Sequence, residues 1–336
     1  MVNRYILASC IMVCLLQSGT SAAATFKLAT ISPDGLSSMK KLREGIERIE
    51  DETDGRVKFK IYPGGVQGDD QTVLRKMRIG QLHGGALAAG SLTRFYPDLQ
   101  IYNLPLQFKS YDEVDYIRRE MDQMISDGLG ASGIESLSFS ETGFAYLFSQ
   151  KSVRTVADLK GLKAWIPEND PIAAELINSF GVSPIPLGIT DVLAGLQTGL
   201  IDAVMAPPSI ALALQWHNHV SHMTDLPMVY IYSMLAMDSK AYKRISDEDK
   251  LTVSSVIDSM SIEMEAENRL DNQKAYQAIK SIGITIVEAD NIEEWQSVAD
   301  DSVNKLITSG EISPESVRLY LSNLQKYRNS GSAGFN

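Results

Sequence analysis

The chain has 336 residues, which is enough for two domains. Its composition, with 44% hydrophobic and 22% charged residues, is ordinary for a soluble globular protein. The formal net charge of −11 argues against nucleic acid or an anionic membrane surface as a partner. The net charge does not identify a ligand, because charges far from a site are screened beyond about 8 Å in physiological salt.

The start of the chain has the pattern of a secretory signal peptide. Arg4 supplies a positive charge, residues 5–16 are apolar, and residues 21–24 offer a cleavage site of small side chains. The apolar stretch is shorter than the ~20 residues that a membrane-spanning helix needs. We therefore expect a cleaved leader over residues 1–24 and a periplasmic location.

Both cysteines, Cys10 and Cys14, fall within this leader. Residues 7–10 resemble a lipoprotein box, but the cysteine of this box precedes most of the apolar stretch. A lipid anchor is therefore the less favoured interpretation. The mature chain would hold no thiol, which excludes disulfides, a cysteine nucleophile and thiolate metal sites.

The first part of the mature chain predicts alternating strands and helices. A helix reaching to about residue 53 follows from apolar side chains at helical spacing, and a strand over 57–61 follows from alternation with lysines. Asp69 or Asp70 begins the next helix. Short apolar runs at 26–30 and 84–89 complete the pattern of a parallel sheet with helices on its faces.

The rest of the chain predicts a second domain of the same class. The expected elements are a helix over 111–127, strands over 134–139, 144–148, 164–166, 182–186, 203–205 and 228–237, helices over 190–198 and 209–217, and late helices from 292 and 313. A helix over 247–282 contains no proline or glycine and could span on the order of 50 Å, so it can brace both domains. The expected division is 25–145 with 234–270, then 146–233 with 271–328, and a flexible tail over 329–336.

Residues 158–171 carry the main signal for a ligand-binding site. The apolar run 164–166 fits a buried parallel strand that a proline ends. Asp170 fits the N-cap of the next helix, and Pro171 fits its first turn. Ligands of open α/β sheets bind at the carboxyl ends of strands, so we expect Trp165, Glu168 and Asp170 at such an edge.

The same stretch resembles the extracytoplasmic solute-binding proteins of TRAP transporters (the C4-dicarboxylate-binding, DctP-like type). The family pattern there is Asp-Leu-Lys-Gly-Leu-Lys-x-Arg-x-Pro, and residues 158–167 match it except at the arginine. Further matches lie at 55–57, 62–65, 68–70, 104–108 and 196–202. The resemblance implies an α/β fold of the type II periplasmic-binding-protein kind, with two domains, a hinge of crossing strands and a long shared helix. It also implies capture of a small solute in an interdomain cleft and delivery to membrane permease subunits.

The departure from the family pattern concerns the carboxylate clamp. Trp165 stands at the position of the ligand-binding arginine, and Ala145 and Ala206 stand where relatives have a second arginine and an asparagine. No other side chain offers the two-pronged contact of a guanidinium group to a carboxylate. We therefore predict an atypical member of the family that does not use this clamp, and we do not expect a C4-dicarboxylate ligand.

The expected lining is aromatic and apolar, with acids at the same edge. The predicted ligand-binding residues are Phe144, Tyr146, Trp165, Met205, Pro207, Trp216, Glu168, Asp170 and Asp70. Such a lining suits an apolar or amphipathic solute, an organic cation held against an indole, or an anion held by backbone amides. Each residue also has a structural interpretation: core packing for the apolar ones, helix capping for the two aspartates, and a solvated position for the glutamate.

A histidine cluster at residues 217, 219 and 222 raises metal binding as a hypothesis. On a helix only His219 and His222 share a face, and no carboxylate has matching spacing, so a solvated helix end is favoured.

The favoured function is a solute receptor that works without a cofactor or a metal. One alternative is a receptor that passes its ligand to a periplasmic scaffold or sensor protein. An enzyme in the same cleft is a third hypothesis, but the chain has no Gly-x-Ser-x-Gly, P-loop or His-Glu-x-x-His motif.

Overall fold

A computed structural model describes residues 24–168 and 170–332. The predicted leader lies outside this part except for Ala24. The described strands form one sheet in the order β2-β1-β3-β8-β4-β7-β5-β6, with β9 paired to β8. Their bounds are β1 Ala24–Thr30, β2 Val57–Tyr62, β3 Gly84–Ala88, β4 Ile134–Ser149, β5 Lys163–Pro167, β6 Ser183–Leu187, β7 Ala203–Ala206, β8 His222–Asp238 and β9 Thr285–Val287.

The two ends of the sheet are parallel and its centre is antiparallel. β1 pairs in parallel with β2 and β3, and β5 pairs in parallel with β6 and β7. Between these ends, β4 and β8 run antiparallel to each other and connect the two halves of the molecule. The predicted crossing strands are confirmed, but they are longer than expected, because 134–139 and 144–148 are one strand.

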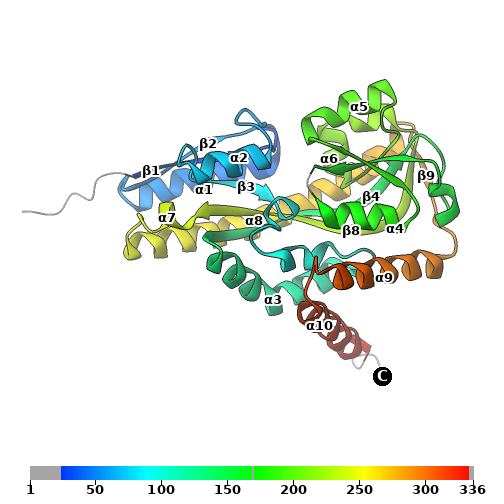
Figure 1. Ribbon diagram of the computed structural model, residues 1–336. Helices are drawn as coiled ribbons and strands as arrows, with labels where there is room; N and C mark the ends of the chain where they lie inside the picture. Colours follow the sequence, from blue (N-terminus) through cyan, green and yellow to red (C-terminus); the bar gives the residue numbers. More distant parts are fainter. Residues whose placement is uncertain (1–23, 169, 333–336) are drawn as a thin grey trace, which may run out of the picture.

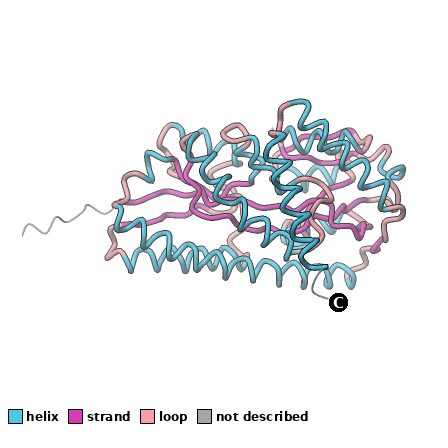
Figure 2. Tube along the Cα trace, turned by 90° about the horizontal axis from the view of Figure 1, so that it is seen from below, coloured by secondary structure: helices cyan, strands magenta, loops and turns pink. Residues whose placement is uncertain are grey.

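Helices cover both faces of the sheet, as Figure 2 shows. Their bounds are α1 Ser37–Glu52, α2 Asp70–Arg78, α3 Tyr111–Ala131, α4 Pro171–Ser179, α5 Val192–Thr198, α6 Pro208–Ala213, α7 Ser239–Tyr242, α8 Asp247–Ser281, α9 Ile292–Ser309 and α10 Pro314–Ser332. Short 3-10 helices are η1 Ala89–Leu92, η2 Pro97–Asn103, η3 Val156–Leu159, η4 Ile189–Asp191 and η5 Trp216–His219. Each half therefore buries an apolar core on each side of the sheet.

The long helix α8 joins the two halves, as the sequence predicts. Ser246 caps it by accepting a hydrogen bond of 3.1 Å from the backbone N–H of Asp249. Its first turns pack Val253 and Ile257 into the core that contains α1, and its last turn packs Ile279 into the core that contains α5 and α6. Figure 1 shows α8 running from the half that carries α1 to the half that carries α6.

The C-terminal helix α10 lies elsewhere than the expected domain division suggests. Val317, Tyr320 and Leu324 are buried in the core that also holds α2 and α3, although 271–328 was expected with the second domain. The remaining boundaries stay a prediction. Helix α10 continues to Ser332, so residues 329–332 are helical and not a flexible tail, and 333–336 fall outside the described part.

Among the described helices, none combines the length and the apolar character needed to cross a bilayer.

Candidate functional site

Two sets of loops meet where the parallel strands end. The loops after β1, β2 and β3 lie at one edge, and the loops after β5, β6 and β7 lie at the other, because parallel strands end at a common edge. Gln100 donates a hydrogen bond of 3.1 Å to Asp170 Oδ1, and a Cβ placed on Gly65 would lie 3.8 Å from the methyl carbon of Thr190. We call the place where these loops meet the junction.

Trp165 lies on β5 and faces away from α4. Its neighbours Ala164 and Ile166 are buried on the other side of the strand. The indole N–H of Trp165 donates 2.9 Å to the carbonyl oxygen of Leu187, the last residue of β6. Its ring meets the edge of Trp216, with centroids 5.2 Å apart and planes at 69°. The indole is half-buried, so its position is fixed by the protein while part of its surface stays free.

Tyr146 shares the side of the sheet on which Trp165 lies. Both side chains pack against the core that holds α5 and α6, and Tyr146 also borders the core that holds α2 and α3. Burial raises the pKa of the Tyr146 hydroxyl, and the charge of Asp225 adds to the shift. Trp216, also predicted as a site residue, is only 2% exposed and belongs to the same core. The structure thus brings Tyr146, Trp165 and Trp216 onto one side.

Other predicted site residues lie apart from this aromatic group. Phe144 is buried in the core of the N-terminal half, 5.0 Å from the ring of Tyr111 and 5.7 Å from that of Tyr230. Met205 faces the opposite side of the sheet from Trp165. Pro207 is buried at the N-cap of α6. The contribution of these residues to ligand binding stays a prediction.

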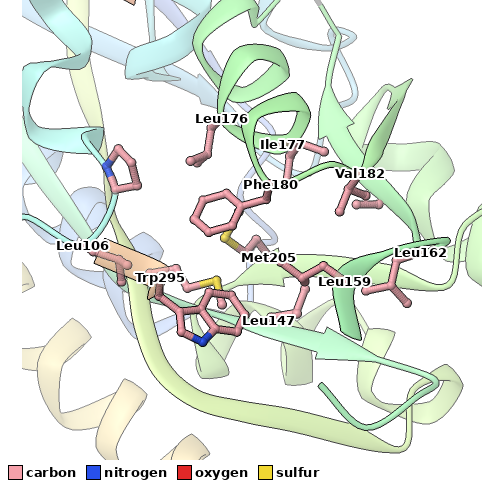
Figure 3. Close-up of a pocket in the computed structure, with 13 residues that line it drawn as sticks. Leu106, Leu147, Leu159, Leu162, Leu176, Ile177, Phe180, Val182, Met205 and Trp295 are labelled. Atoms are coloured by element: carbon pink, nitrogen blue, oxygen red, sulfur yellow. The ribbon is translucent and has the colours of Figure 1, made fainter. Parts of the chain in front are cut away.

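Met205 borders an apolar cavity inside the C-terminal half, shown in Figure 3. The labelled side chains in the figure come from β4, η3, α4, β7, α9 and the segments that connect such elements, and Trp295 closes one side. The cavity has a volume of ≈ 30 Å³ and a wholly apolar lining. That volume is far below the several hundred Å³ of an ordinary small-molecule site, so the cavity is a packing defect of the core.

Asp70 is a buried carboxyl group at the junction. The adjacent Asp69 caps α2 by accepting from the backbone N–H of Thr72 at 2.8 Å, so the capping role falls to Asp69. Asp70 is 9% exposed, and its Oδ2 accepts from the backbone N–H of Ala88 at 2.9 Å. Its Oδ1 is buried and has no hydrogen-bond partner within the described part of the chain. Burial raises the pKa of Asp70 to about 6, against the opposing effects of the Ala88 N–H and the nearby Ser91 hydroxyl, whose own hydrogen bond goes to the Ala88 carbonyl oxygen.

Asp170 caps α4 as the sequence predicts, and Glu168 is exposed. The Asp170 Oδ1 accepts from the backbone N–H of Ala173 at 3.0 Å as well as from Gln100. Burial raises the pKa of Asp170, and these two hydrogen bonds oppose the shift. Gln100 could not be predicted as a site residue, because a glutamine in a 3-10 helix seventy residues away carries no signal of this contact. Nor could Gly90, where an added Cβ would overlap Asp170 and lie 2.6 Å from Gln100 Nε2.

The histidine cluster does not form the expected helix end. His217 and His219 lie in η5, whereas His222 starts β8, so the helical spacing assumed for this cluster was wrong. Within the described residues there is no group of three or more metal-ligating side chains.

Comparison with known proteins identifies the family. A model of the family described as bacterial extracellular solute-binding protein, family 7 (DctP), matches residues 28–309. The chain belongs to this family. The C4-dicarboxylate-binding periplasmic protein DctP of Rhodobacter capsulatus is 25% identical to it, covering 75% of this chain and 77% of the relative. A solute-binding protein of Chromohalobacter salexigens is also 25% identical, covering 83% and 84%.

Solved structures share the fold of this family 7 protein. A TRAP periplasmic solute binding protein from Chromohalobacter salexigens, with bound D-glucuronate, superposes with a TM-score of 0.82 at 21% identity, over 90% of this chain and 99% of that one. A TRAP protein from Desulfovibrio salexigens, with bound orotic acid, gives 0.84 at 16% identity over the same shares. The predicted two-domain, type II-like fold is confirmed. The chain is a solute-binding receptor of the transport class, and this family is not an enzyme family.

Proposed function

We propose that this protein captures a small organic solute at the junction and delivers it to the membrane subunits of a TRAP-type permease. Membership of a receptor family and the meeting of two parallel-strand edges support this proposal. The observation that carries it is the contact of Gln100 with Asp170, because it joins the two edges directly. Relatives of the TRAP class favour a permease over a scaffold or sensor protein as recipient.

The ligand is not expected to be held as in an arginine clamp. The proteins with D-glucuronate and orotic acid bind carboxylates, whereas Trp165, Ala145 and Ala206 offer this chain no guanidinium group. A carboxylate buried there without a cationic partner would cost several kcal/mol. We propose instead that Trp165 and Tyr146 present ring surface to the solute, and that Asp70, Asp170 and the exposed Glu168 supply polar contacts.

Native mass spectrometry tests the receptor function. The protein is expressed with its leader, purified from the periplasm without unfolding, and examined for a bound small molecule. We expect one solute per chain, lost on denaturation. Trp165→Ala should lower its occupancy, because the indole is the largest half-buried ring at the site. A chain that co-purifies with no solute, and that no metabolite extract stabilises against heating, contradicts the proposal.

Closure of the two halves is tested at Gly90. Ligand binding can favour a closed form only through contacts made there and not in the open form. An added Cβ on Gly90 would overlap Asp170 Oδ2, so Gly90→Ala should hold the two edges apart. We expect a larger radius of gyration in small-angle scattering and weaker binding of the co-purified solute. Gly130→Ala is the matched control, because nothing lies within 4 Å of its added carbon.

The location in the periplasm is tested by N-terminal sequencing. Within the described part of the chain, β1 already includes Ala24, the last residue of the stretch expected as leader. We propose that the mature chain starts close to this residue, as in a cleaved secretory protein. A membrane-bound product that retains Cys10 would instead identify a lipoprotein.

A further inference from the structure

The loops that form the junction carry charge of one sign. Within the described residues they comprise 31–35, 63–70 and 89–91 from the N-terminal half, and 168, 170, 188–191 and 207–209 from the C-terminal half. None of these stretches contains a lysine, arginine or histidine. Their charged residues are Asp34, Asp69, Asp70, Glu168, Asp170 and Asp191. Carboxylates gathered in one place without balancing cations produce a negative potential, which attracts cations and repels anions.

Two of these acids already have cations near them. Arg43 donates to Asp34 at the surface, at 2.6 Å. The charge of Arg75 contributes to a lowered pKa of Asp69, together with the hydrogen bonds of the helix cap. Lys76 also donates to Gln67, in the loop after β2, at 2.8 Å. The other four acids form no salt bridge with any residue that the structure describes.

Asp70 is the acid whose environment points most directly to a ligand. It is nine-tenths buried, ionised above a pKa of about 6, and one of its oxygens has no donor. A buried carboxylate oxygen without a donor is unfavourable, and proteins rarely leave one unless a ligand supplies the missing donor. Oδ1 is itself buried, but the neighbouring Ala88 is exposed, so the carboxyl group of Asp70 lies directly beneath the surface at this corner of the junction.

The partial positive charges at the helix N-termini of the junction do not cancel the negative potential of these carboxylates. The positive ends of α2 and α4 are already occupied by the carboxylates of Asp69 and Asp170. The backbone N–H of Ser209 in the first turn of α6 donates to Asn272. The described starts of α1, after Leu36, and of η4 and α5, after Gly188 and Asp191, have no side-chain cap; α1 is the longer helix and offers the stronger N-terminus to an anion. Anion binding at α1 is therefore the competing outcome that the test must separate.

We propose that the solute of this receptor carries a positively charged nitrogen, an ammonium or guanidinium group, that donates to Asp70 Oδ1 at the junction. This inference rests on the proposed function and names its ligand class. A charged N–H donor satisfies the free oxygen and neutralises the buried carboxylate in one contact. The half-buried indole of Trp165 then offers ring surface to the apolar part of the solute.

The test uses two sets of matched probes that differ in charge and little in size. One set is tyramine, tyrosol and 4-hydroxyphenylacetate, and the other is cadaverine, 1,5-pentanediol and glutarate. Binding to the mature chain, freed of endogenous solute, is measured by calorimetry at pH 7.5, where Asp70 is ionised. We expect the amine of each set to bind about 10- to 100-fold more tightly than its carboxylate partner, the difference of a charge-assisted contact.

Asp70→Asn connects any such preference to the proposed contact. The amide oxygen can still accept from Ala88, so the fold is retained while the charge is lost. The amine preference should fall by about tenfold or more in this variant. It should stay unchanged in Asp247→Asn, which removes the same charge from a fully exposed position at the remote start of α8.

Three results would overturn the assignment: tighter binding of the carboxylates, an amine preference that survives Asp70→Asn, or no binding of any probe. None of these three results tests whether the protein is a solute receptor. The presence of a co-purified solute tests that separately. A co-purified carboxylic acid without a basic nitrogen would keep the receptor and reject the cation.

Discussion

Two buried carboxyl groups of this protein have opposite surroundings. Glu141, on the crossing strand β4, is 1% exposed and accepts from Arg269 at 3.1 and 2.9 Å. Tyr230 adds a hydroxyl donor at 3.3 Å, and Asp115 holds the far side of the same guanidinium group at 3.0 Å. Asp70, at the junction, is 9% exposed, accepts one backbone N–H and has no cation beside it among the described residues.

The difference separates a structural acid, Glu141, from Asp70, for which we propose a role in ligand binding. Burial raises the pKa of both groups, but bonds from Arg269 oppose the shift at Glu141. The cost of burying the Glu141 charge is offset inside the protein, where side chains from α3, α8 and β8 meet beside β4. At the junction no cation offsets the cost of burying the Asp70 charge, which is the pattern expected where a ligand completes the site. Variants at each position can break or sharpen this comparison.

Arg269→Ala should give the largest effect. It leaves Glu141 buried without a counter-charge, and breaking a buried pair from one side costs about 3–5 kcal/mol of unfolding free energy. Urea unfolding at pH 7 measures the loss. Arg48→Ala, an exposed arginine of α1 paired with Glu52, is the control and should change stability by about 1 kcal/mol or less.

Removing both charges gives a second check on this pair. Arg269→Met combined with Glu141→Gln should recover a large part of the stability, because no buried charge remains uncompensated. A double variant as unstable as Arg269→Ala would show that packing of the arginine, and not its charge, supports the crossing strands.

Asp70→Asn should raise the free energy of unfolding of the ligand-free protein, whereas Arg269→Ala should lower it. At neutral pH the ionised carboxylate is buried without a cation, and the amide relieves that cost. The raised pKa corresponds to an upper limit of about 3 kcal/mol, and we expect about 1–2 kcal/mol because the amide oxygen must also fit the site. The measurement is the free energy of unfolding without ligand at pH 7.5.

The pH dependence gives this prediction a clear sign. The pKa of Asp70 rises from 3.8 in the unfolded chain to about 6 in the folded protein, so the folded state binds more protons between these values. This group therefore lowers the unfolding free energy as pH rises from about 4 to about 7. The gain from Asp70→Asn should be present above pH 7 and vanish near pH 4. An equal gain at both pH values would mean that the charge is not its cause.

What the sequence could predict depended on how local the signal was. The cap of α4 by Asp170, the strand around Trp165 and the long helix α8 each follow from residues a few positions apart, and all are confirmed. The partners of the junction acids are far away in the chain. Asp70 meets Ala88 and Asp170 meets Gln100, and no pattern of spacing announces either contact.

The side on which a strand residue lies was hard to predict for a different reason. Alternation assigns faces only while the register is regular. β4 has register shifts at 136/138, 141/143 and 145/147, which surround Phe144 and Tyr146. Each shift moves the following side chains to the other face. Phe144 therefore turns into the core of the N-terminal half, whereas Trp165 lies on β5, whose pairing with β6 is regular. The role of Trp165 in ligand binding stays a prediction.

Gln100→Met should give the smallest change in the free energy of unfolding. It tests how much a neutral donor contributes to holding a carboxylate at the junction. Gln100 is 2% exposed, and its amide is the side-chain donor to Asp170 that reaches across from the other half. Its loss removes one hydrogen bond to a carboxylate that keeps the N–H of Ala173, so we expect about 1 kcal/mol at pH 7 by thermal unfolding. Because the donor favours the ionised acid, its loss should raise the pKa of Asp170 further, and the destabilisation should disappear at low pH. Gln123→Met removes a similar but exposed bond to Asp127 and should cost less. An equal cost for both variants would mean that the contact between the halves contributes no more than a surface pair.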